Sequence, residues 1–454
     1  MAIASTNPAT GEVVKTFDAH TEAEVDLAIA AAVVAHEAVR DWDFDQRAKH
    51  MHKLGDLIEA EVDSLAEIMT LEMGKTLAQA KGEVLKCAKC CHFYADHAAE
   101  MLADEIVETD AAKSYRAYLP LGVVLAVMPW NYPLWQVIRF IAPALMAGNT
   151  GLLKHASNVP QCALALQDLV ERAGFPEGSF SALLISGSRV EKILRDDRVR
   201  AATLTGSEPA GASVAAICGD EIKPTVLELG GSDAFIIMPS ADIDEAVKVG
   251  VKARTQNNGQ SCIAAKRFII HADIYDAVKA KFVEAFEALI IGDPTDGDTD
   301  IGPLVSREAR AELDEQVQTA LSEGALRVTG CETMHGEGAY YRPGIIENIA
   351  KGTQTFYQEF FGPVAMFFKV EDLDAAIELA NDSPFGLGSS IWTQDKAEQS
   401  TAIKRLEAGG TFVNAMTASD PRLPFGGIKR SGYGRELSSE GIRAFCNVKT
   451  VYIA

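Results

Sequence analysis

The segment from Val123 to Lys154 reads VVLAVMPWNYPLWQVIRFIAPALMAGNTGLLK. It begins with an apolar run at residues 123–128, continues as an apolar helix predicted for 133–146, and ends in a second apolar run at 151–154. Short apolar runs separated by a helix are typical of neighbouring parallel strands in a sheet covered on both faces. The segment therefore predicts an α/β fold, and ligands of such sheets bind at the carboxyl ends of the strands.

Further apolar runs extend this alternation downstream, with a second helix beginning near Pro160. Another α/β region follows the Gly230-Gly231 pair, includes a helix from Asp242, and continues to about residue 414. The runs that we interpret as strands in these two regions lie at residues 181–185, 201–204, 225–229, 234–238 and 267–270.

The first hundred residues have helical spacing instead. Thr21 and Glu24 form a capping box, which marks the start of the first helix. No chemistry is visible here, and we interpret the region as scaffold. Its predicted helices cover residues 21–42, 46–71 and 77–102.

Two segments read as exposed strands. Residues 111–119 alternate polar and apolar side chains, as a half-exposed strand does, and residues 446–454 form a short strand at the chain end. An exposed strand edge usually finds a partner, so both segments are candidates for contact with another chain.

The length and net charge of the chain limit its domain organisation and the kinds of partner that it can bind. At 454 residues the chain is too long for one core and suggests two or three domains. The net charge of −22, from 64 acidic and 42 basic residues, argues against nucleic acid and anionic membranes as partners. No apolar run is long enough for a membrane span, and the N-terminus lacks the pattern of a secretory signal.

Cysteine usage points to a reducing compartment. Eight cysteines in so long a chain do not suggest a disulfide framework, so we expect a cytoplasmic protein. Four neighbouring side chains resemble metal ligands, but no second ligand cluster follows them, and a buried helix face is favoured over a metal site. They are Cys87, Cys90, Cys91 and His92.

Cys262 lies in the polar turn QNNGQSCIAAKR, residues 256–267, just before a strand-like run. Small neighbours place the thiol where it can meet a ligand. A free cysteine is also commonly a small buried hydrophobe, and only its surroundings make it reactive. The turn alone leaves both interpretations open.

Three further polar side chains follow predicted strands. Asn131, in a turn with two prolines, presents an amide that suits an oxyanion, although a turn asparagine often bonds its own backbone. Lys154 is well placed to bind a ribose or phosphate, but it is equally interpreted as an ordinary solvated surface lysine. Glu228 follows apolar residues, so burial would raise its pKa and suit a general base, unless it caps a helix or pairs with a cation.

The strand–glycine–helix turn around Gly206 and Ser207 lets backbone approach a pyrophosphate at a helix N-terminus. This turn is weak evidence alone, because no GxGxxG fingerprint occurs in the chain. The order of the motifs is more specific. It runs Pro-Trp-Asn-Tyr-Pro, Lys, Thr-Gly-Ser, Glu-Leu-Gly-Gly, Gly-Gln-Ser-Cys, Glu-Phe-Phe-Gly-Pro and Pro-Phe-Gly-Gly.

This ordered series resembles the aldehyde dehydrogenase superfamily over essentially the whole chain. The resemblance implies a Rossmann-type cofactor domain from residues 1–102 and 121–230 and an α/β catalytic domain from 231–428. It also implies a small β oligomerisation element from 103–120 and 429–454, and hence a homodimer or homotetramer.

The resemblance also implies roles for individual residues. Cys262 would be the nucleophile, Asn131 with the Cys262 backbone N–H would form the oxyanion hole, and Glu228 would activate the deacylating water. The expected cofactor-binding residues are Trp130, Lys154, Ser157, Gly206, Ser207, Glu359 and Phe361.

Ser157 bears on the choice of cofactor. Many NAD-using relatives carry a glutamate three residues after the cofactor lysine, where it binds the ribose 2′-hydroxyl. Serine removes the carboxylate that would repel a 2′-phosphate, so we expect NADP to be preferred. Weaker use of NAD is the alternative, because removing the repelling carboxylate does not itself create affinity for NADP.

Arg139 bears on the substrate. It lies in a helix that is apolar almost all round, where a guanidinium needs an anion. That anion is either a substrate carboxylate or an Asp or Glu of the chain. The helix resembles that of bacterial succinate-semialdehyde dehydrogenases, which implies that Trp135, Arg139 and Ser419 hold the substrate.

We therefore expect an NADP-linked oxidation of succinate semialdehyde to succinate, with a thiohemiacetal and then a thioester on Cys262. The alternatives are oxidation of another semialdehyde or an aliphatic aldehyde, and a catalytically silent structural homologue. Glu228 argues against a CoA-acylating relative, because those enzymes typically lack the deacylating glutamate.

Overall fold

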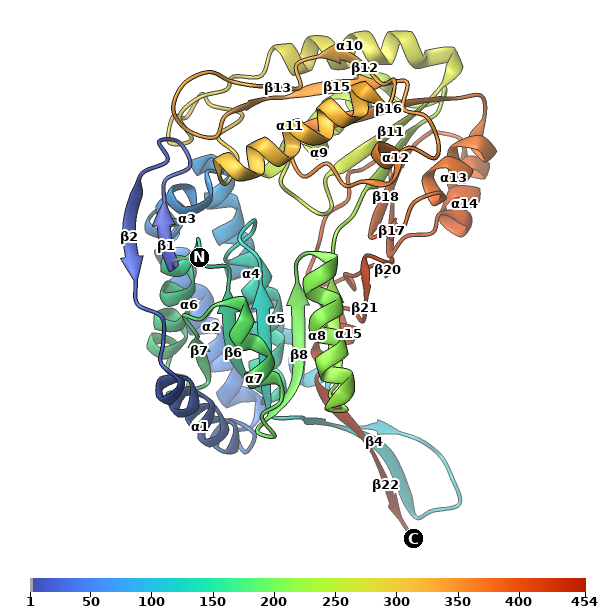
Figure 1. Ribbon diagram of the computed structural model, residues 1–454. Coiled ribbons are helices and arrows are strands. Elements are labelled where there is room, and N and C mark those ends of the chain that lie inside the picture. The colour runs from blue at the N-terminus through green and yellow to red at the C-terminus, as the bar shows by residue number, and fades with distance from the viewer. Residues whose placement is uncertain (1–2) are drawn as a thin grey trace.

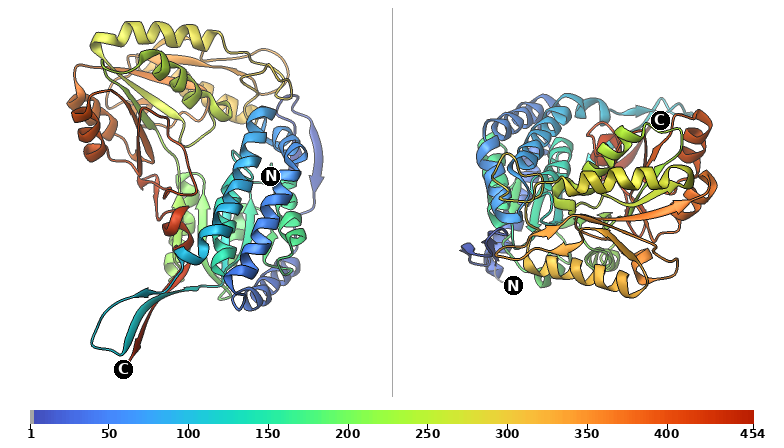
Figure 2. Two further views of the ribbon diagram at one scale, coloured as in Figure 1. Left: turned by 180° about the vertical axis from the view of Figure 1, so that it is seen from behind. Right: turned by 90° about the horizontal axis from the view of Figure 1, so that it is seen from above.

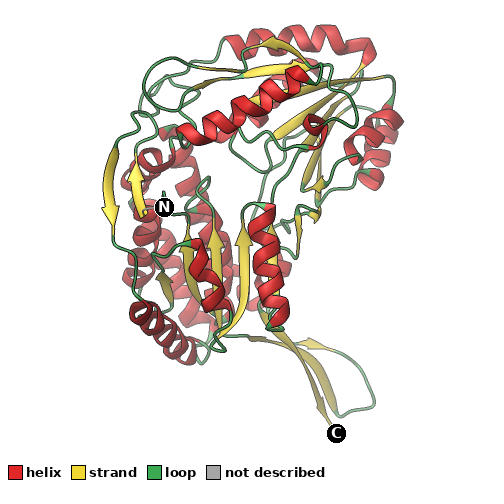
Figure 3. Ribbon diagram, in the orientation of Figure 1, coloured by secondary structure: helices red, strands yellow, loops and turns green. Residues whose placement is uncertain are grey.

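The structure is a computed structural model that describes residues 3–454. Figure 1 shows two lobes, each built around a sheet with helices on both faces, and a narrow β ribbon that projects away from them. The view from behind in Figure 2 shows the same two lobes and the same projecting ribbon. Helices and strands alternate through both lobes, as Figure 3 makes plain.

The first lobe contains a six-stranded sheet with the order β21-β9-β8-β5-β6-β7. Five strands are parallel and β21 runs antiparallel beside β9. The predicted α/β alternation is therefore confirmed here. The strands are β5 (Val123–Met128), β6 (Thr150–His155), β7 (Phe180–Ala182), β8 (Val199–Thr205), β9 (Thr225–Glu228) and β21 (Gly432–Tyr433).

Helices cover this sheet and form most of the first lobe. Thr21 and Glu24 make the expected capping box. The single helix expected for residues 46–71 is wrong: the chain breaks at Glu61, whose backbone leaves helical geometry, and two helices result. The helices are α1 (Glu22–Val39), α2 (Phe44–Ala60), α3 (Val62–Met73), α4 (Leu77–Met101), α5 (Trp135–Ala147), α6 (Pro160–Ala173), α7 (Val190–Leu194) and α8 (Glu208–Asp220).

The second lobe contains a seven-stranded sheet with the order β12-β15-β16-β11-β10-β18-β19, in which only β12 is antiparallel to its neighbour. Phenylalanines packed between the sheet and its helices form part of the core. The strands are β10 (Asp233–Ile237), β11 (Ala265–His271), β12 (Leu326–Thr329), β15 (Gly344–Glu347), β16 (Val364–Val370), β18 (Gly388–Trp392) and β19 (Gly410–Val413).

Helices of the second lobe lie over both faces of this sheet (Figure 1). Asp242 caps the first of them, as its position before the helical run predicts. They are α9 (Ile243–Thr255), α10 (Tyr275–Glu287), α11 (Arg307–Ser322), α12 (Gln354–Tyr357), α13 (Leu373–Asn381) and α14 (Lys396–Arg405), with the short 3₁₀ helices η2 (Gln256–Gly259) and η3 (Ala272–Ile274); a third, η1 (Gly187–Arg189), lies in the first lobe.

The projecting ribbon is a three-stranded antiparallel sheet of β3 (Glu105–Ile106), β4 (Lys113–Pro120) and β22 (Cys446–Ile453). The two segments that read as exposed strands thus pair with each other. The C-terminal part of this sheet is shorter than residues 429–454. The intervening chain contributes β21 to the edge of the six-stranded sheet and α15 (Ser438–Arg443) to the first lobe.

The remaining strands are short pairs that sequence patterns did not reveal. The first two pair near the N-terminus, where the amide of Ala4 also donates to the carbonyl of Ser157 at 3.0 Å. Among residues 3–454, no helix is both long and apolar enough to cross a lipid bilayer. The short pairs are β1 (Ile3–Thr6) with β2 (Val13–Phe17), β13 (Glu332–Thr333) with β14 (Tyr341–Arg342), and β17 (Phe385–Gly386) with β20 (Ile428–Lys429).

Candidate active site

Cys262 lies on the turn that leads into β11, in an unusual backbone conformation. Asn257, Asn258 and Gly259 have φ angles of 56°, 57° and 76°, which is the left-handed region. A side chain at Gly259 would place its Cβ 2.4 Å from the carbonyl carbon of Gly362, so the turn needs glycine there. This geometry holds Cys262 half-buried at the surface of the turn.

Two cavities meet at Cys262, and Gln136 also lines both. We call the larger one, of about 570 Å³, the α4–α5 cavity; the other, of about 490 Å³, is the sheet-edge cavity. Residues that line the α4–α5 cavity include Lys86, Trp135, Arg139, Ser419 and Phe425. Residues that line the sheet-edge cavity include Trp130, Asn131, Gly206, Ser207, Glu359 and Phe361.

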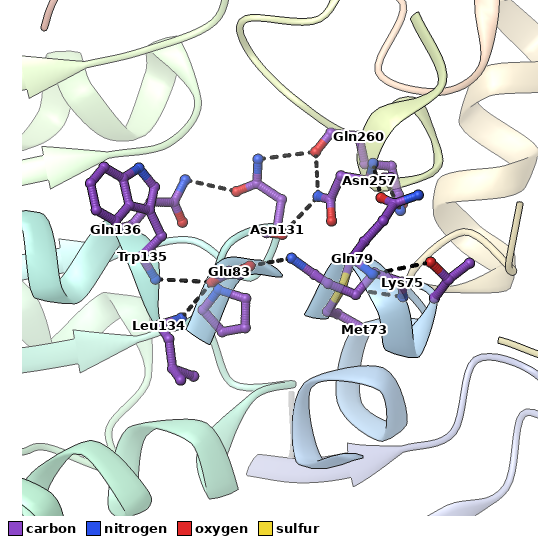
Figure 4. Close-up of polar contacts among 12 residues, drawn as sticks. Met73, Lys75, Gln79, Glu83, Asn131, Leu134, Trp135, Gln136, Asn257 and Gln260 are labelled. Carbon is purple, nitrogen blue, oxygen red and sulfur yellow. Dashed lines mark hydrogen bonds and ion pairs between the residues drawn. The ribbon is translucent and has the colours of Figure 1, made fainter. Parts of the chain in front are cut away.

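Asn131 is held by a network of amide side chains, which Figure 4 displays. Its Nδ2 donates to the carbonyl of Gln260 at 3.1 Å, and its Oδ1 accepts from Nε2 of Gln136 at 2.9 Å. Its own carbonyl accepts from Nδ2 of Asn257 at 2.7 Å. The side chain is therefore fixed, and one of its two Nδ2 protons has no partner in this network.

Glu83 fixes the start of α5 from the neighbouring helix (Figure 4). Its Oε1 accepts from the backbone amides of Leu134 and Trp135, both at 2.9 Å, and its other oxygen pairs with buried Lys75. A carboxylate at a helix N-terminus satisfies amides that the helix leaves unpaired. Glu83 thereby sets the position of the Trp135 indole in the α4–α5 cavity.

Lys266 stabilises the backbone of the turn at Cys262. Its buried Nζ donates to the carbonyls of Ser261 and Cys262, both at 2.6 Å, and forms an ion pair of 3.0 Å with Glu359. Burial raises the pKa of the Cys262 thiol to about 12, while the positive charges of Lys266 and Arg139 oppose that rise. The thiol form is therefore favoured at neutral pH in the protein alone.

Glu228 ends β9 and is almost fully buried. Neither carboxylate oxygen has a hydrogen-bond partner among the described residues. Burial, and then the charge of Glu436, hold the pKa of Glu228 well above its ordinary value. The expected direction of the shift is confirmed, but Glu228 lines neither cavity in this conformation.

Arg139 lines the α4–α5 cavity, yet the chain itself supplies its anion. Its guanidinium forms an ion pair with buried Glu436 and donates to Oγ1 of Thr205 at 3.0 Å. It also lies over the ring of Phe425, 4.8 Å from the centroid. This is the structural ion pair that the alternative interpretation of Arg139 required.

Lys154 and Ser157 stand apart from both cavities. Lys154 is near the carboxyl end of β6, opposite Val127 of β5, and burial alone lowers its pKa. Ser157 follows two residues after β6. Both residues therefore lie, with Trp130, at the carboxyl ends of the strands in the six-stranded sheet. Ligands of parallel sheets bind at these ends.

Comparison with known proteins gives this arrangement its context. Residues 1–451 match the aldehyde dehydrogenase family. The chain belongs to that family.

Individual relatives of this aldehyde dehydrogenase chain cover it throughout. A Mycobacterium ulcerans protein named succinate-semialdehyde dehydrogenase (NADP+) 1 is 61% identical over 457 residues, with all of both chains covered. A Mycobacterium tuberculosis protein of the same name is 59% identical, again over all of both chains. The crystal structure of succinic semialdehyde dehydrogenase from Streptococcus pyogenes, in complex with NADP+, has 40% identity, covers 99% of both chains and superposes with a TM-score of 0.97.

Sequence reasoning missed several charged groups of this aldehyde dehydrogenase site, among them Lys86, Lys266 and Glu436. Lys86 lies on α4, in the region interpreted as scaffold, and its side chain lines the α4–α5 cavity, so this region also contributes walls of the site. Lys266 and Glu436 face the site from β11 and from the segment before α15. A lysine within an amphipathic helix gives no local signal, since solvated lysines occur in such helices throughout proteins.

Proposed function

We propose that the protein oxidises succinate semialdehyde to succinate with NADP, through a thioester on Cys262. The position of Cys262 between two cavities is the observation that carries this proposal. An aldehyde in the α4–α5 cavity and a nicotinamide in the sheet-edge cavity would both reach the same sulfur atom. The mycobacterial relatives named as NADP-dependent succinate-semialdehyde dehydrogenases support the choice of substrate and cofactor.

The chemistry follows from the groups around the sulfur. The Cys262 thiol first loses its proton to solvent, and the thiolate then adds to the aldehyde carbon. The oxyanion that forms accepts from Nδ2 of Asn131 and the Cys262 backbone N–H. NADP+ held in the sheet-edge cavity would supply the hydride acceptor, and loss of hydride from that carbon would leave a thioester on Cys262. Glu228 then accepts a proton from water as the water attacks the thioester, releasing the acid and the free thiol.

The edge of the six-stranded sheet fits a dinucleotide. The first turn of α8 carries no side-chain cap, so the backbone amides of Glu208 and Ala210 are available to a pyrophosphate, whereas Pro209 between them has none. Trp130 and Phe361, with ring centroids 5.7 Å apart, line the sheet-edge cavity together with Glu359. Lys154 and Ser157, at the end of β6, would hold the ribose and its 2′-phosphate.

We further propose that each of the three sheet-containing units has one of the expected domain roles. The six-stranded unit would bind the cofactor, the seven-stranded unit would supply Cys262, and the three-stranded ribbon would join subunits into a dimer or tetramer. Apolar side chains exposed on the ribbon, among them Val448 and Tyr452, support the last role. Eight unpaired cysteines support a cytoplasmic location.

The test compares two aldehydes and two cofactors. Nicotinamide reduction is followed with succinate semialdehyde and with butanal, each with NADP and with NAD. We expect the highest kcat/KM for succinate semialdehyde with NADP. Equal kcat/KM for the two aldehydes would refute the substrate, in favour of a general aliphatic aldehyde dehydrogenase in which Arg139 serves only its ion pair with Glu436.

Replacing Ser157 with glutamate should reverse the cofactor preference. A carboxylate at this position repels a 2′-phosphate and accepts from a 2′-hydroxyl, so kcat/KM with NADP should fall about 30-fold or more while that with NAD does not fall. Ser400→Glu, on the exposed face of α14, is the matched control and should change neither value. An unchanged NADP preference in Ser157→Glu would place the 2′-phosphate elsewhere.

A further inference from the structure

The α4–α5 cavity contains several cations, and most of them are already neutralised. Lys75 pairs with Glu83, Arg139 pairs with Glu436, and Lys248 pairs with Glu245 near the surface. Lys252 is exposed at the cavity rim. A cation whose charge is matched inside the protein has less to offer a ligand, and an exposed cation such as Lys252 is screened by water, so these groups do not explain how the cavity would select an acidic aldehyde.

Lys86 differs from the others. It is half-buried on α4, and among residues 3–454 no carboxylate lies within ion-pair distance of its ammonium group. Its Nζ donates to Oγ of Ser419 at 2.6 Å and lies 4.1 Å from the centroid of the Trp135 ring. These three side chains come from α4, α5 and the loop after β19, and all three line the α4–α5 cavity.

From this geometry we propose that Lys86 is the residue that binds the distal carboxylate of the substrate. An ammonium withdrawn from water is stabilised by an anion, and the cavity is open to receive one. Ser419 accepts from Lys86, so its own hydroxyl proton is available to the same carboxylate. Trp135 supplies an apolar wall for the carbons between the two functional groups.

The ionisation of Lys86 accords with this role. Burial, followed by the nearby charge of Arg139, lowers the pKa of Lys86 to about 8, while Glu83, Cys87 and Cys90 raise it slightly. Asp420, next to Ser419, is engaged by Arg422. The positive charge on Lys86 is therefore present below about pH 8 and is lost above it, so selection of an acidic aldehyde should weaken as the pH rises.

The inference rests on the proposed function, and one set of measurements separates the two. The readout is the ratio of kcat/KM for succinate semialdehyde to that for butanal, which has the same number of carbons and no carboxylate. The ratio should fall about 30-fold in Lys86→Met, because a charge-assisted hydrogen bond is lost. It should also fall in the wild type above pH 8. Lys81→Met, at a half-exposed position of the same helix that does not line the cavity, is the control and should keep the wild-type ratio.

Binding of succinate, measured by calorimetry, gives a readout independent of turnover, and affinity should fall by a similar factor in Lys86→Met. Lys86→Gln is measured in parallel, so that the result does not depend on the folding of one variant. A wild type that prefers succinate semialdehyde, with a ratio unchanged by either substitution, would overturn the role of Lys86 and leave the proposed function intact. A wild type without preference would overturn both.

Discussion

Alanine in place of Cys262 should abolish aldehyde oxidation, with kcat reduced at least about 10⁴-fold, since no other cysteine among the described residues lines either cavity. Cys262 is the cysteine that lines both cavities. The measurement is nicotinamide reduction with the variant at saturating substrate. Cys446→Ala is the matched control, because Cys446 is also half-buried but lies at the start of β22, and it should retain activity.

The pKa of Cys262 leads to a second prediction, which concerns the pH dependence of its alkylation. Burial raises the pKa of this thiol to about 12. The thiolate fraction therefore increases about tenfold with each pH unit below that value, and alkylation of the cofactor-free protein by iodoacetamide should accelerate accordingly between pH 7 and 9. A rate that does not change over this range would mean that the thiolate is already formed.

Glutamine in place of Glu228 should stop the reaction after one turnover. The amide cannot accept a proton from water, so the thioester would accumulate, with a burst of one reduced cofactor per site and a steady-state rate about 10³-fold lower. Rapid-mixing absorbance measurements resolve the burst. Glu245→Gln, an exposed change on α9, is the control. A steady-state rate close to that of the wild type, without a burst, would assign the base to another group.

The raised pKa of Glu228 fixes the sign of two pH effects. Below this pKa the carboxyl is protonated and cannot act as a base, so kcat of the wild type should rise with pH. Because the folded protein holds this proton more tightly than the unfolded chain does, the contribution of Glu228 to stability declines as pH rises above the unfolded-state pKa. Glu228→Gln should therefore be at least as stable as the wild type at pH 8.

The sequence was sufficient for the features that depend on local pattern. Apolar runs separated by helices predicted the parallel strands of the first lobe, because a strand buried on both faces needs apolar residues throughout. The ordered motifs, through the family resemblance, named several residues that line the cavities at Cys262, including Asn131 and Glu359. Lys154, Ser157 and Glu228, named in the same way, line neither cavity. The N-terminal pair β1 and β2 was missed, because residues 13–17 are mostly exposed and carry no alternating pattern.

Charge pairing across the fold lay beyond the sequence. Nothing near Arg139 in the chain announces Glu436, which lies almost three hundred residues away, so the anion of Arg139 could not be chosen in advance. For Lys86 the sequence could not show that a partner is missing. The lack of a carboxylate beside its ammonium group is visible only in the folded structure, where every neighbouring element is in place. Tertiary contacts decide which buried charges are matched and which are free to meet a ligand.

The amide network around Asn131 has a consequence for how the chain folds. Asn131 is bonded to Asn257 and Gln260, which lie 126 and 129 positions away, and the backbone amide of Asn257 donates to Oε1 of Gln79, 178 positions away. Closing such long loops costs conformational entropy before any contact compensates for it, so we expect these bonds to form after the local contacts within each lobe. Catalytic competence is thus a property of the completed chain: neither lobe alone contains a site, and a protein that has recovered its helices and sheets still lacks one until the two lobes dock.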